Sequence, residues 1–426
     1  MKRISSNPRS AVSTAIVVAI VVVIIVVAAV GAYAAIGTGK QTVTSTITSG
    51  TVSTVPTTVT SVSTSTSIST SVSTSVSTAS SSISISLTST LPSETVLETG
   101  SSLLYPLFNI WAPALKSAYP SVQFTPASTG SGTGQSSAET GTVQIGASDA
   151  YLTNAQAAQY PYILNIPLAI SAQQINYNLP MIPANDHLNF SGPVLAGIYS
   201  GSITTWNNPA ITALQSPSVA ALLPSNTIIP IHRSDGSGDT FIFTSYLSFS
   251  TPSWASGPGY GTTVNWPSVP AATAANGNGG MVTASEGAEY SIAYIGVSFL
   301  HSALTQPTPL GYAYLKNEAG NFVNITQANI LAAASALAPQ TPANERISLV
   351  FAPGANSYPI INYEYAMVNT TQSVPGMALT LRTFLDWMVA PQYGNSPTYL
   401  NQVNFIALPT NTLQLSLAQI NEITGP

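Results

Sequence analysis

Three short segments rich in Ser and Gly come directly before stretches that are predicted to be helical. They are residues 100–102, 130–134 and 235–240. The start of a helix exposes unpaired N–H groups and the positive end of the helix dipole, and Ser or Gly lets an anion approach them closely. One such turn is most often only a helix cap. Three of them in one chain favour a site that binds an oxyanion.

Arg233 lies two residues before Asp235, at the start of the third segment, and is one of five basic residues after position 92. A planar guanidinium suits the oxygens of a phosphate or a carboxylate. The alternative is a structural ion pair with Asp235. Both hold if Asp235 orients the guanidinium while a ligand uses its outer edge.

Asp149 ends the segment Gly-Ala-Ser-Asp at residues 146–149, after a predicted strand. A carboxylate beside an oxyanion favours binding when the ligand carries a proton, because the carboxylate can then accept a hydrogen bond from it. Phosphate carries such a proton near neutral pH, whereas sulfate does not, so Asp149 would reject sulfate by charge repulsion. The alternative is an ordinary turn or cap residue.

Composition argues against several other functions, namely nucleic-acid binding, metal binding and chemistry that needs Cys. The chain of 426 residues has 9 basic and 14 acidic residues and a net charge of −5, which argues against binding to nucleic acid. It has no Cys, and its three His residues are too far apart for a local metal-ligand motif. An enzyme that acts on phosphate esters remains an alternative, with Ser131 or Ser237 as nucleophile and His232 as base. Neither Ser fits the Gly-x-Ser-x-Gly pattern.

The first 92 residues have a composition unlike that of a globular domain. Residues 11–36 are uncharged and mostly apolar, and they follow Lys2, Arg3 and Arg9. This pattern predicts a membrane anchor within residues 1–40 with the rest of the chain outside, or alternatively a cleaved signal peptide. In residues 41–92, Ser and Thr make up 34 of 52 residues, which predicts a disordered stalk rather than a β-rich segment. A structural or adhesive surface protein is therefore a further alternative.

Residues 93–426 are predicted to form the globular part. Strands are predicted at residues 122–125, 143–146, 163–170, 227–231, 347–351 and 360–367, and helices at residues 104–118, 240–247, 327–336 and 377–389. This alternation predicts an α/β architecture. Acceptor sequences for N-glycosylation at Asn189, Asn324 and Asn369 agree with a location outside the cell.

Several runs of residues in this part resemble one family. They are HRSDGSGDTF at 232–241, GASD at 146–149, IYSG at 198–201, NGNGGMV at 276–282, AYIG at 293–296 and YPIINY at 358–363. Together they resemble the phosphate-binding protein of the ABC-type high-affinity phosphate transporter, over nearly all of residues 95–426. The resemblance implies a two-lobed, periplasmic-binding-protein-like fold of type II (a Venus flytrap) with two interlobe crossovers. One lobe would contain residues 93–170 and 357–426, and the other residues 171–356.

The resemblance also implies the ligand contacts. Phosphate would be bound by Ser102, Leu103, Ser131, Asp149, Arg233, Ser237, Gly238 and Asp239, with Asp235 and Thr240 in support. Asp239 stands where many members of the family have a Thr donor. Its side chain is a candidate acceptor for a second ligand proton, in which case affinity would strengthen as the pH falls from 7.5 to 5.5.

The expected function is therefore that of an extracellular receptor at the cell membrane, held by its N-terminal helix. It would capture inorganic phosphate in the cleft and deliver it to the permease of an ABC transporter. No covalent chemistry, cofactor, metal or nucleic acid is expected to take part.

Overall fold

The computed structural model describes residues 85–305 and 309–426, all of which belong to one unit, Ser81–Pro426. The predicted anchor and nearly all of the predicted stalk lie outside these residues. No helix within the described ranges is long and apolar enough to cross a membrane.

A nine-stranded mixed sheet runs through the unit in the order β2-β1-β3-β12-β4-β8-β6-β7, with β9 paired to β4. Its strands are β1 (Thr95–Gly100), β2 (Gln123–Thr125), β3 (Ile145–Ser148), β4 (Ile163–Tyr177), β6 (Ile229–Arg233), β7 (Thr273–Ala275), β8 (Ser291–Gly296), β9 (Gly311–Tyr312) and β12 (Ile361–Asn369). A second sheet has the order β11-β10-β5 and consists of β5 (Asn189–Phe190), β10 (Tyr314–Lys316) and β11 (Phe322–Val323).

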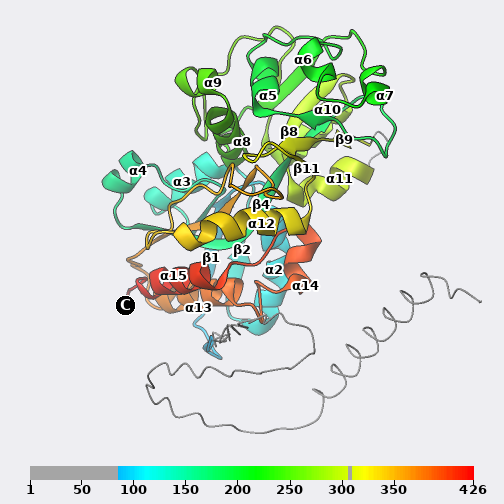
Figure 1. The fold of residues 1–426 in the computed structure, drawn as a ribbon. Helices are drawn as coiled ribbons and strands as arrows, with labels where there is room; N and C mark the ends of the chain where they lie inside the picture. The colour runs from blue at the N-terminus through cyan, green and yellow to red at the C-terminus, as the bar shows by residue number, and fades with distance from the viewer. Residues whose placement is uncertain (1–84, 306–308) are drawn as a thin grey trace, which may run out of the picture. The chain divides into compact units, whose positions relative to one another are not determined.

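The long strand β4 joins two halves of the main sheet. Its residues from Ile163 to Ala172 pair with β12, and those from Gln173 to Tyr177 pair with β8. We call the part around β1, β2, β3 and β12 the first lobe and the part around β6, β7 and β8 the second lobe; they lie below and above β4 in Figure 1. Every residue of β4 is buried, as expected of a strand covered on both faces.

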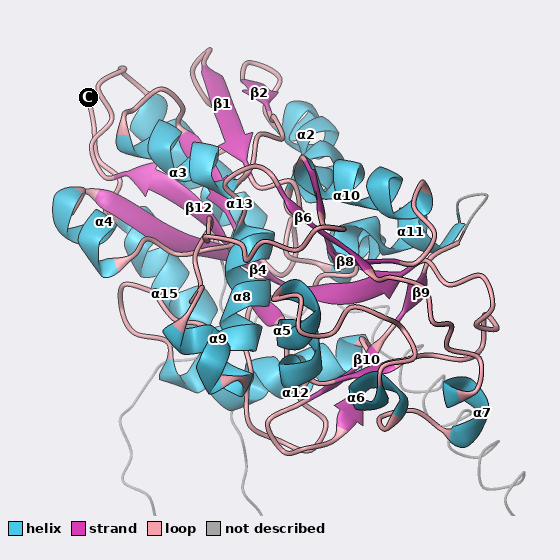
Figure 2. Ribbon diagram, turned by 90° about the horizontal axis from the view of Figure 1, so that it is seen from above, coloured by secondary structure: helices cyan, strands magenta, loops and turns pink. Residues whose placement is uncertain are grey.

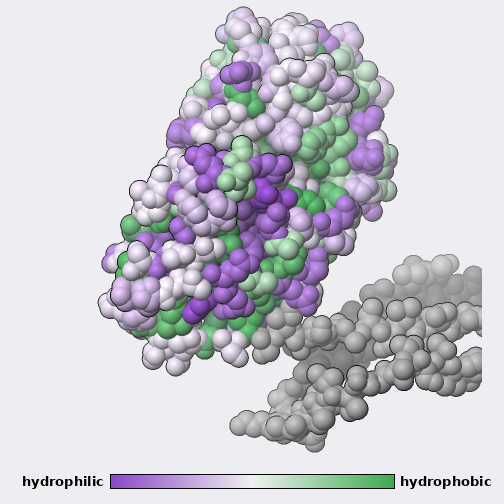
Figure 3. Space-filling model, turned by 90° about the vertical axis from the view of Figure 1, so that its left-hand side faces the viewer, coloured by the Kyte–Doolittle hydropathy of each residue, from purple (hydrophilic) through white to green (hydrophobic). Residues whose placement is uncertain are grey.

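Helices cover both lobes (Figures 1 and 2). The first lobe holds α2 (Tyr105–Ala118), α3 (Ser131–Glu139), α4 (Asn154–Gln159), α13 (Met377–Val389), α14 (Pro397–Leu400), the 3₁₀ helix η3 (Asn401–Val403) and α15 (Thr410–Asn421). The second holds α5 (Gly192–Tyr199), α6 (Pro209–Thr212), α7 (Pro217–Ala220), α8 (Gly238–Ser250), α9 (Pro252–Ser256), α10 (Gly277–Glu286), η1 (Val297–Phe299) and α11 (Leu300–Thr305). Between them, α12 (Gln327–Leu337) and η2 (Ala338–Gln340) follow one another, and α12 packs on β12 and β4. On the face seen in Figure 3, hydrophilic residues gather at the height of α3 and α4.

Four of the helices were predicted from the sequence. The predictions at residues 104–118, 240–247, 327–336 and 377–389 are confirmed by α2, α8, α12 and α13. In α2, the residues Leu107, Phe108, Trp111 and Leu115 are fully buried, as their spacing indicated. The predicted strands at 122–125, 163–170 and 360–367 correspond to β2, β4 and β12. Those at 143–146 and 227–231 form as β3 and β6, each two residues later in the chain.

The predicted strand at residues 347–351 is wrong, although its residues are apolar. Leu349 N donates to the side chain of Asn362 at 3.3 Å, and Phe351 N donates to the Pro359 carbonyl at 2.7 Å. Phe351 also has a φ of 60°, in the left-handed region. The segment is an irregular connection whose N–H groups bond to a side chain and a turn instead of a neighbouring strand.

The same connection is fixed to the first lobe by a buried acid. The carboxyl group of Glu345 accepts hydrogen bonds from Ser416 Oγ at 2.9 Å and Gln419 Nε2 at 2.5 Å, both on α15. Burial raises the pKa of Glu345 to about 9, against the opposing effect of these two hydrogen bonds. The folded protein therefore holds a proton on Glu345 that the unfolded chain releases near pH 4 to 5.

We expect Glu345→Gln to weaken the dependence of stability on pH. A raised pKa stabilises the fold at low pH, and this contribution is lost as the pH rises from the unfolded value toward 9, by up to about 1.4 kcal/mol per unit. Urea unfolding at several pH values between 5 and 9 measures this slope. The exposed Glu318→Gln serves as control and should keep the wild-type slope. Equal slopes for Glu345→Gln and the wild type would contradict the assignment.

Candidate functional site

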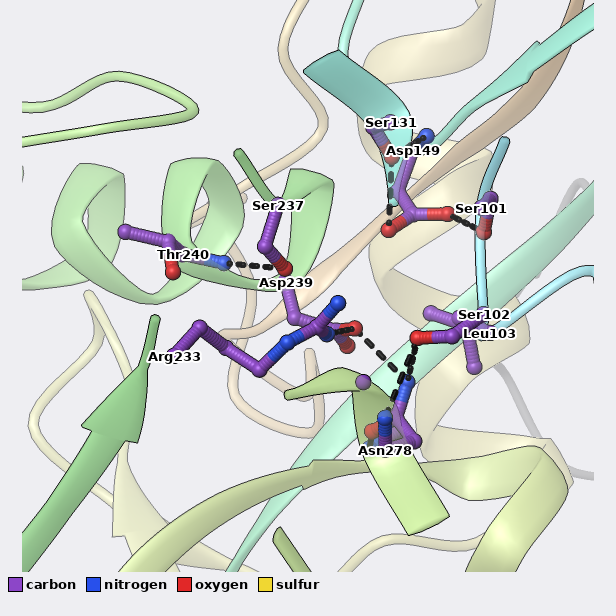
Figure 4. Close-up of polar contacts among 12 residues, drawn as sticks. Ser101, Ser102, Leu103, Ser131, Asp149, Arg233, Ser237, Asp239, Thr240 and Asn278 are labelled. Atoms are coloured by element: carbon purple, nitrogen blue, oxygen red, sulfur yellow. Dashed lines mark hydrogen bonds and ion pairs between the residues drawn. The ribbon is translucent and has the colours of Figure 1, made fainter. Parts of the chain in front are cut away.

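The N-terminal ends of four helices meet between the lobes (Figure 4). Helices α2 and α3 come from the first lobe, and α8 and α10 from the second. Ser131 is the first residue of α3, and Ser237 caps α8 by accepting a hydrogen bond from Thr240 N at 3.3 Å. The three Ser- and Gly-rich segments singled out in the sequence are thus brought together, and the Asn-Gly-rich start of α10 joins them.

Glycine lets the backbones of the two lobes touch. Gly132 N donates to the Gly236 carbonyl at 2.8 Å, directly from one lobe to the other. A Cβ atom placed on Gly238 would lie 2.5 Å from Cβ of Asp149, closer than two such atoms can approach. The lobes are therefore closed around the site, and a larger residue at Gly238 would separate them.

Arg233 lies at the centre of the site and is only 3% exposed. Its Nε donates to Asp235 Oδ1 at 2.7 Å, its Nη2 pairs with the other oxygen of Asp235, and its Nη1 lies 2.6 Å from Asp239 Oδ2. Burial by itself would lower the pKa of Arg233, but Asp235 and Asp239 outweigh it and raise that pKa. Three of the five guanidinium N–H groups are thus used, which leaves two for a ligand.

The ion pair with Asp235 was one of the two sequence-based interpretations of Arg233, and it is confirmed. Burial would raise the pKa of Asp235, but hydrogen bonds and charge from Arg233 lower it overall. Gly277 N, at the start of α10, also donates to Asp235 Oδ1 at 3.1 Å. The pair remains ionised and fixes the orientation of the guanidinium.

Asp239 is completely buried on the first turn of α8. Besides Arg233, its carboxylate accepts hydrogen bonds from Asn278 Nδ2 at 2.7 Å and from Gln173 Nε2 at 3.1 Å. Burial and the neighbouring charge of Asp149 raise the pKa of Asp239 to about 7, against the opposing effect of Arg233. The side chain therefore changes its charge near neutral pH.

Asp149 follows β3 and is 1% exposed. Ser101 Oγ donates to its Oδ1, and Ser131 Oγ donates to its Oδ2 at 3.3 Å. Burial raises the pKa of Asp149, while these hydroxyl donors and the charge of Arg233 favour the carboxylate. The side chain thus faces the same buried region as Arg233 (Figure 4).

The first-lobe residues Ser102 and Leu103 are also buried here. Ser102 Oγ accepts hydrogen bonds from the backbone and side chain of Asn278, at 3.1 and 3.0 Å. Leu103 presents only its backbone to polar partners, and its carbonyl accepts from Ser298 Oγ at 2.7 Å. Every site residue predicted from the sequence therefore lies in or beside one cluster.

A set of unpaired backbone donors distinguishes this cluster. The buried backbone N–H groups of Ser102, Leu103, Ser131, Gly238 and Asp239 all lie at this site, and none of them has an acceptor in the described part of the chain. Most of them belong to the first turns of helices, where no carbonyl lies within reach. A buried N–H group without an acceptor is costly, so such a set indicates a site built for an anion.

Sequence reasoning missed the parts that Asn278 and Gln173 play in the site, and it included Ser101 only as a member of the Ser- and Gly-rich segment at residues 100–102. Asn278 lies in the NGNGGMV run at residues 276–282, whose Gly-rich start of a helix was the available signal. Gln173 lies in β4, where a pair of Gln residues interrupts an apolar strand. Neither signal indicates which distant residues these side chains contact.

His232 does not take the position that a hydrolase would need. Its Nδ1 lies 3.0 Å from the Arg233 carbonyl, and its ring stacks on Trp266 at 4.8 Å between centroids. Ser131 Oγ bonds instead to Asp149, and Ser237 Oγ caps α8. The arrangement suits binding by hydrogen bonds.

Comparisons with known proteins agree with this geometry. A family model described as the PBP superfamily domain matches residues 51–392. The chain is 31% identical to the phosphate-binding protein PstS of Methanocaldococcus jannaschii over 350 residues, which cover 78% of this chain and 87% of the relative. It is also 31% identical to the phosphate-binding protein PstS of Pasteurella multocida, over 77% of this chain and 90% of the relative.

Among solved structures, the high-affinity periplasmic phosphate-binding protein PfluDING bound with phosphate is similar, with a TM-score of 0.60 and 20% identity. The match covers 76% of this chain and 93% of that protein, and at this identity it shows the two-lobed fold alone. The chain therefore belongs to the PBP superfamily and, within it, to the family of the PstS phosphate-binding proteins.

Proposed function

We propose that this protein captures inorganic phosphate between its lobes and delivers it to the permease of an ABC transporter. The five unpaired backbone N–H groups around Arg233 are the observation that carries this proposal. They surround a small buried region with donors that are already desolvated and oriented. A tetrahedral anion with four oxygens can accept many hydrogen bonds at once, which suits this arrangement.

Asp149 would make the site specific for phosphate over sulfate. Asp149 is held by two hydroxyl donors and lies close to the charge of Arg233. Its carboxylate would accept a hydrogen bond from the proton of hydrogen phosphate. Sulfate has no proton at neutral pH, so it would place its charge against the carboxylate with no hydrogen bond between them. The proposed ligand contacts are Ser102, Leu103, Ser131, Asp149, Arg233, Ser237, Gly238 and Asp239, with Asp235 and Thr240 in support.

For the lobes, we propose boundaries at residues 93–170 with 357–426, and at 171–356. The change of partner along β4, from β12 to β8 after Ala172, supports the first crossover. The beginning of β12 at Ile361 supports the second. Closure of the lobes about these crossovers would signal the bound state to the permease.

For location, we propose a retained N-terminal anchor, an extended stalk and a binding unit on the extracellular face of the cell membrane. The apolar run at residues 11–36 after three basic residues supports the anchor. Glycans would fit Asn324 and Asn369 better than Asn189, because Asn189 Nδ2 already donates to the Leu214 carbonyl at 3.0 Å. A hydrolase or a purely adhesive role has less support, since neither explains the buried set of donors.

We expect Asp149→Asn and Arg233→Ala to weaken phosphate binding by about 2–5 kcal/mol each, because each removes a charged hydrogen-bonding partner of the ligand at a desolvated site. Asp149→Asn should also lose discrimination, since an amide donates a hydrogen bond to sulfate and phosphate alike. Calorimetric titration of the full chain with both anions measures this. The exposed Asp186→Asn and Lys316→Ala are matched controls. Unchanged affinities in both site variants would contradict the proposal.

Asp239 provides a test by proton counting. If it accepts a second ligand proton, the complex contains one proton more than free HPO₄²⁻ and ionised Asp239. We then expect about one proton to be taken up per phosphate near pH 8, and none with Asp239→Asn. Calorimetry in buffers of different ionisation enthalpy measures this number.

Because the pKa of Asp239 is about 7, the pH range in which phosphate affinity should strengthen on acidification differs from the range of 7.5 to 5.5 expected from the sequence. We expect phosphate affinity to strengthen as the pH falls toward 7, and not below pH 7, because there free phosphate and Asp239 already hold their protons. Proton uptake that is equal in the wild type and in Asp239→Asn would instead leave Asp239 as a residue that only positions Arg233.

A further inference from the structure

A second buried acid lies behind Asp149 and has no place in the proposed ligand contacts. Glu364, on β12, is 0% exposed. In the antiparallel pairing of β12 with β3, Tyr365 lies opposite Ser148, so the register places Glu364 opposite Asp149. Each of these two carboxyl groups affects the pKa of the other. Asn362, two residues earlier on the same strand, donates its Nδ2 to the Asp149 carbonyl at 2.7 Å. Side chains of β12 thus lie against both the backbone and the side chain of Asp149.

The irregular pairing of β12 with β4 is located at this residue. The register shifts between Glu364 and Tyr365, whose partners on β4 are Ala169 and Pro167. A bulge of this kind changes the direction in which a neighbouring side chain points. The extra residue of this irregularity is Leu168 on β4, next to the part of β12 that carries Glu364.

Two carboxyl groups in contact inside a protein share a proton, because two buried negative charges repel each other strongly. Asp149 has the better environment for the charge, with hydroxyl donors from Ser101 and Ser131 and the nearby Arg233. Glu364 has one donor, Ser171 Oγ, which bonds to its Oε1. Among the residues described, no hydrogen-bond donor reaches its buried Oε2.

The other charged groups near Asp149 and Glu364 also favour the proton on Glu364. Asp239, on α8, adds a negative charge that disfavours ionisation of Glu364, and Arg233 acts on Asp149. Burial and these negative neighbours raise the pKa of Glu364 well above its usual range. A proton on Oε2 would also satisfy the one atom of this carboxyl group that has no donor.

We infer that Glu364 is a positioning residue for phosphate recognition: it stays protonated and donates a hydrogen bond from Oε2 to Asp149. This inference rests on the proposed function. The donated bond keeps Asp149 ionised, so that Asp149 presents only an acceptor to the ligand. If Asp149 held the proton instead, it would become a donor and would accept sulfate as readily as phosphate. The site of this one proton therefore sets the discrimination between the two anions.

Two variants of Glu364 separate this role from simple packing. In Glu364→Gln, Oε1 can still accept from Ser171 while Nε2 donates to Asp149, so this variant imitates the protonated acid. Glu364→Leu has no donor. We expect Glu364→Gln to keep phosphate affinity within about threefold at pH 8 and to reject sulfate at pH 5, whereas Glu364→Leu loses at least about tenfold for phosphate and gains sulfate binding at pH 5.

Calorimetric titrations of the full chain with phosphate and sulfate at both pH values measure these effects. Glu345→Gln is the matched control, a buried Glu bonded to α15 instead of Asp149, and should bind as the wild type does. Equal phosphate affinity and equal sulfate rejection in Glu364→Leu and Glu364→Gln would overturn the inference. Failure of the wild type to bind phosphate would instead overturn the proposed function.

A direct measurement covers the case in which Glu364→Leu does not fold. In protein labelled with ¹³C at the Glu carboxyl carbons, comparison with Glu364→Gln identifies the Glu364 signal. We expect this signal to stay at the position of a neutral carboxyl group from pH 5 to 8, with and without phosphate. A carboxylate signal, or a titration within that range, would overturn the inference.

Discussion

Burial of an anion requires donors that have already lost their contact with water, and this requirement explains most of the structure around the site. The turn before α2 and the starts of α3 and α8 leave N–H groups that have no protein acceptor, and the fold brings them together beside the start of α10. Each N–H group carries only a partial charge, so the set can surround a ligand without the cost of burying several cations. One guanidinium, Arg233, then supplies the full positive charge.

The fold meets this requirement by placing the two lobes on one strand. Since β4 pairs with β12 along one half and with β8 along the other, the ends of strands from both lobes meet beside it. The helices that begin at the same place are α2 after β1, α3 after β2, α8 after β6 and α10 after β7. Gly132, Gly236 and Gly238 let the backbones approach without side chains between them. Closure and the supply of donors are thus consequences of a single arrangement.

The sequence predicted the parts of the site that depend on local chemistry. The Ser- and Gly-rich starts of helices, Arg233 with Asp235, and Asp149 after a strand were all recognisable from residue types and spacing. The contacts of Asn278 with Ser102 and of Glu364 with Asp149 were not, because each joins segments that are more than 170 residues apart. The apolar residues 347–351 suggested a strand, but the left-handed backbone at Phe351 depends on contacts with residues that follow it.

A site with three carboxylates around one guanidinium looks unsuited to an anion until its protons are counted. Asp235 is neutralised by Arg233, which fixes the direction of the remaining N–H groups. Asp239 changes its charge near pH 7, close to the range in which phosphate itself does. In the proposed arrangement, Asp149 stays ionised because the hydroxyl donors of Ser101 and Ser131, the charge of Arg233 and a proton on Glu364 all favour its carboxylate. Hydrogen-bond direction, and not net charge, is then what selects the ligand: a carboxylate can only accept, so the anion beside it must be one that still has a proton to donate.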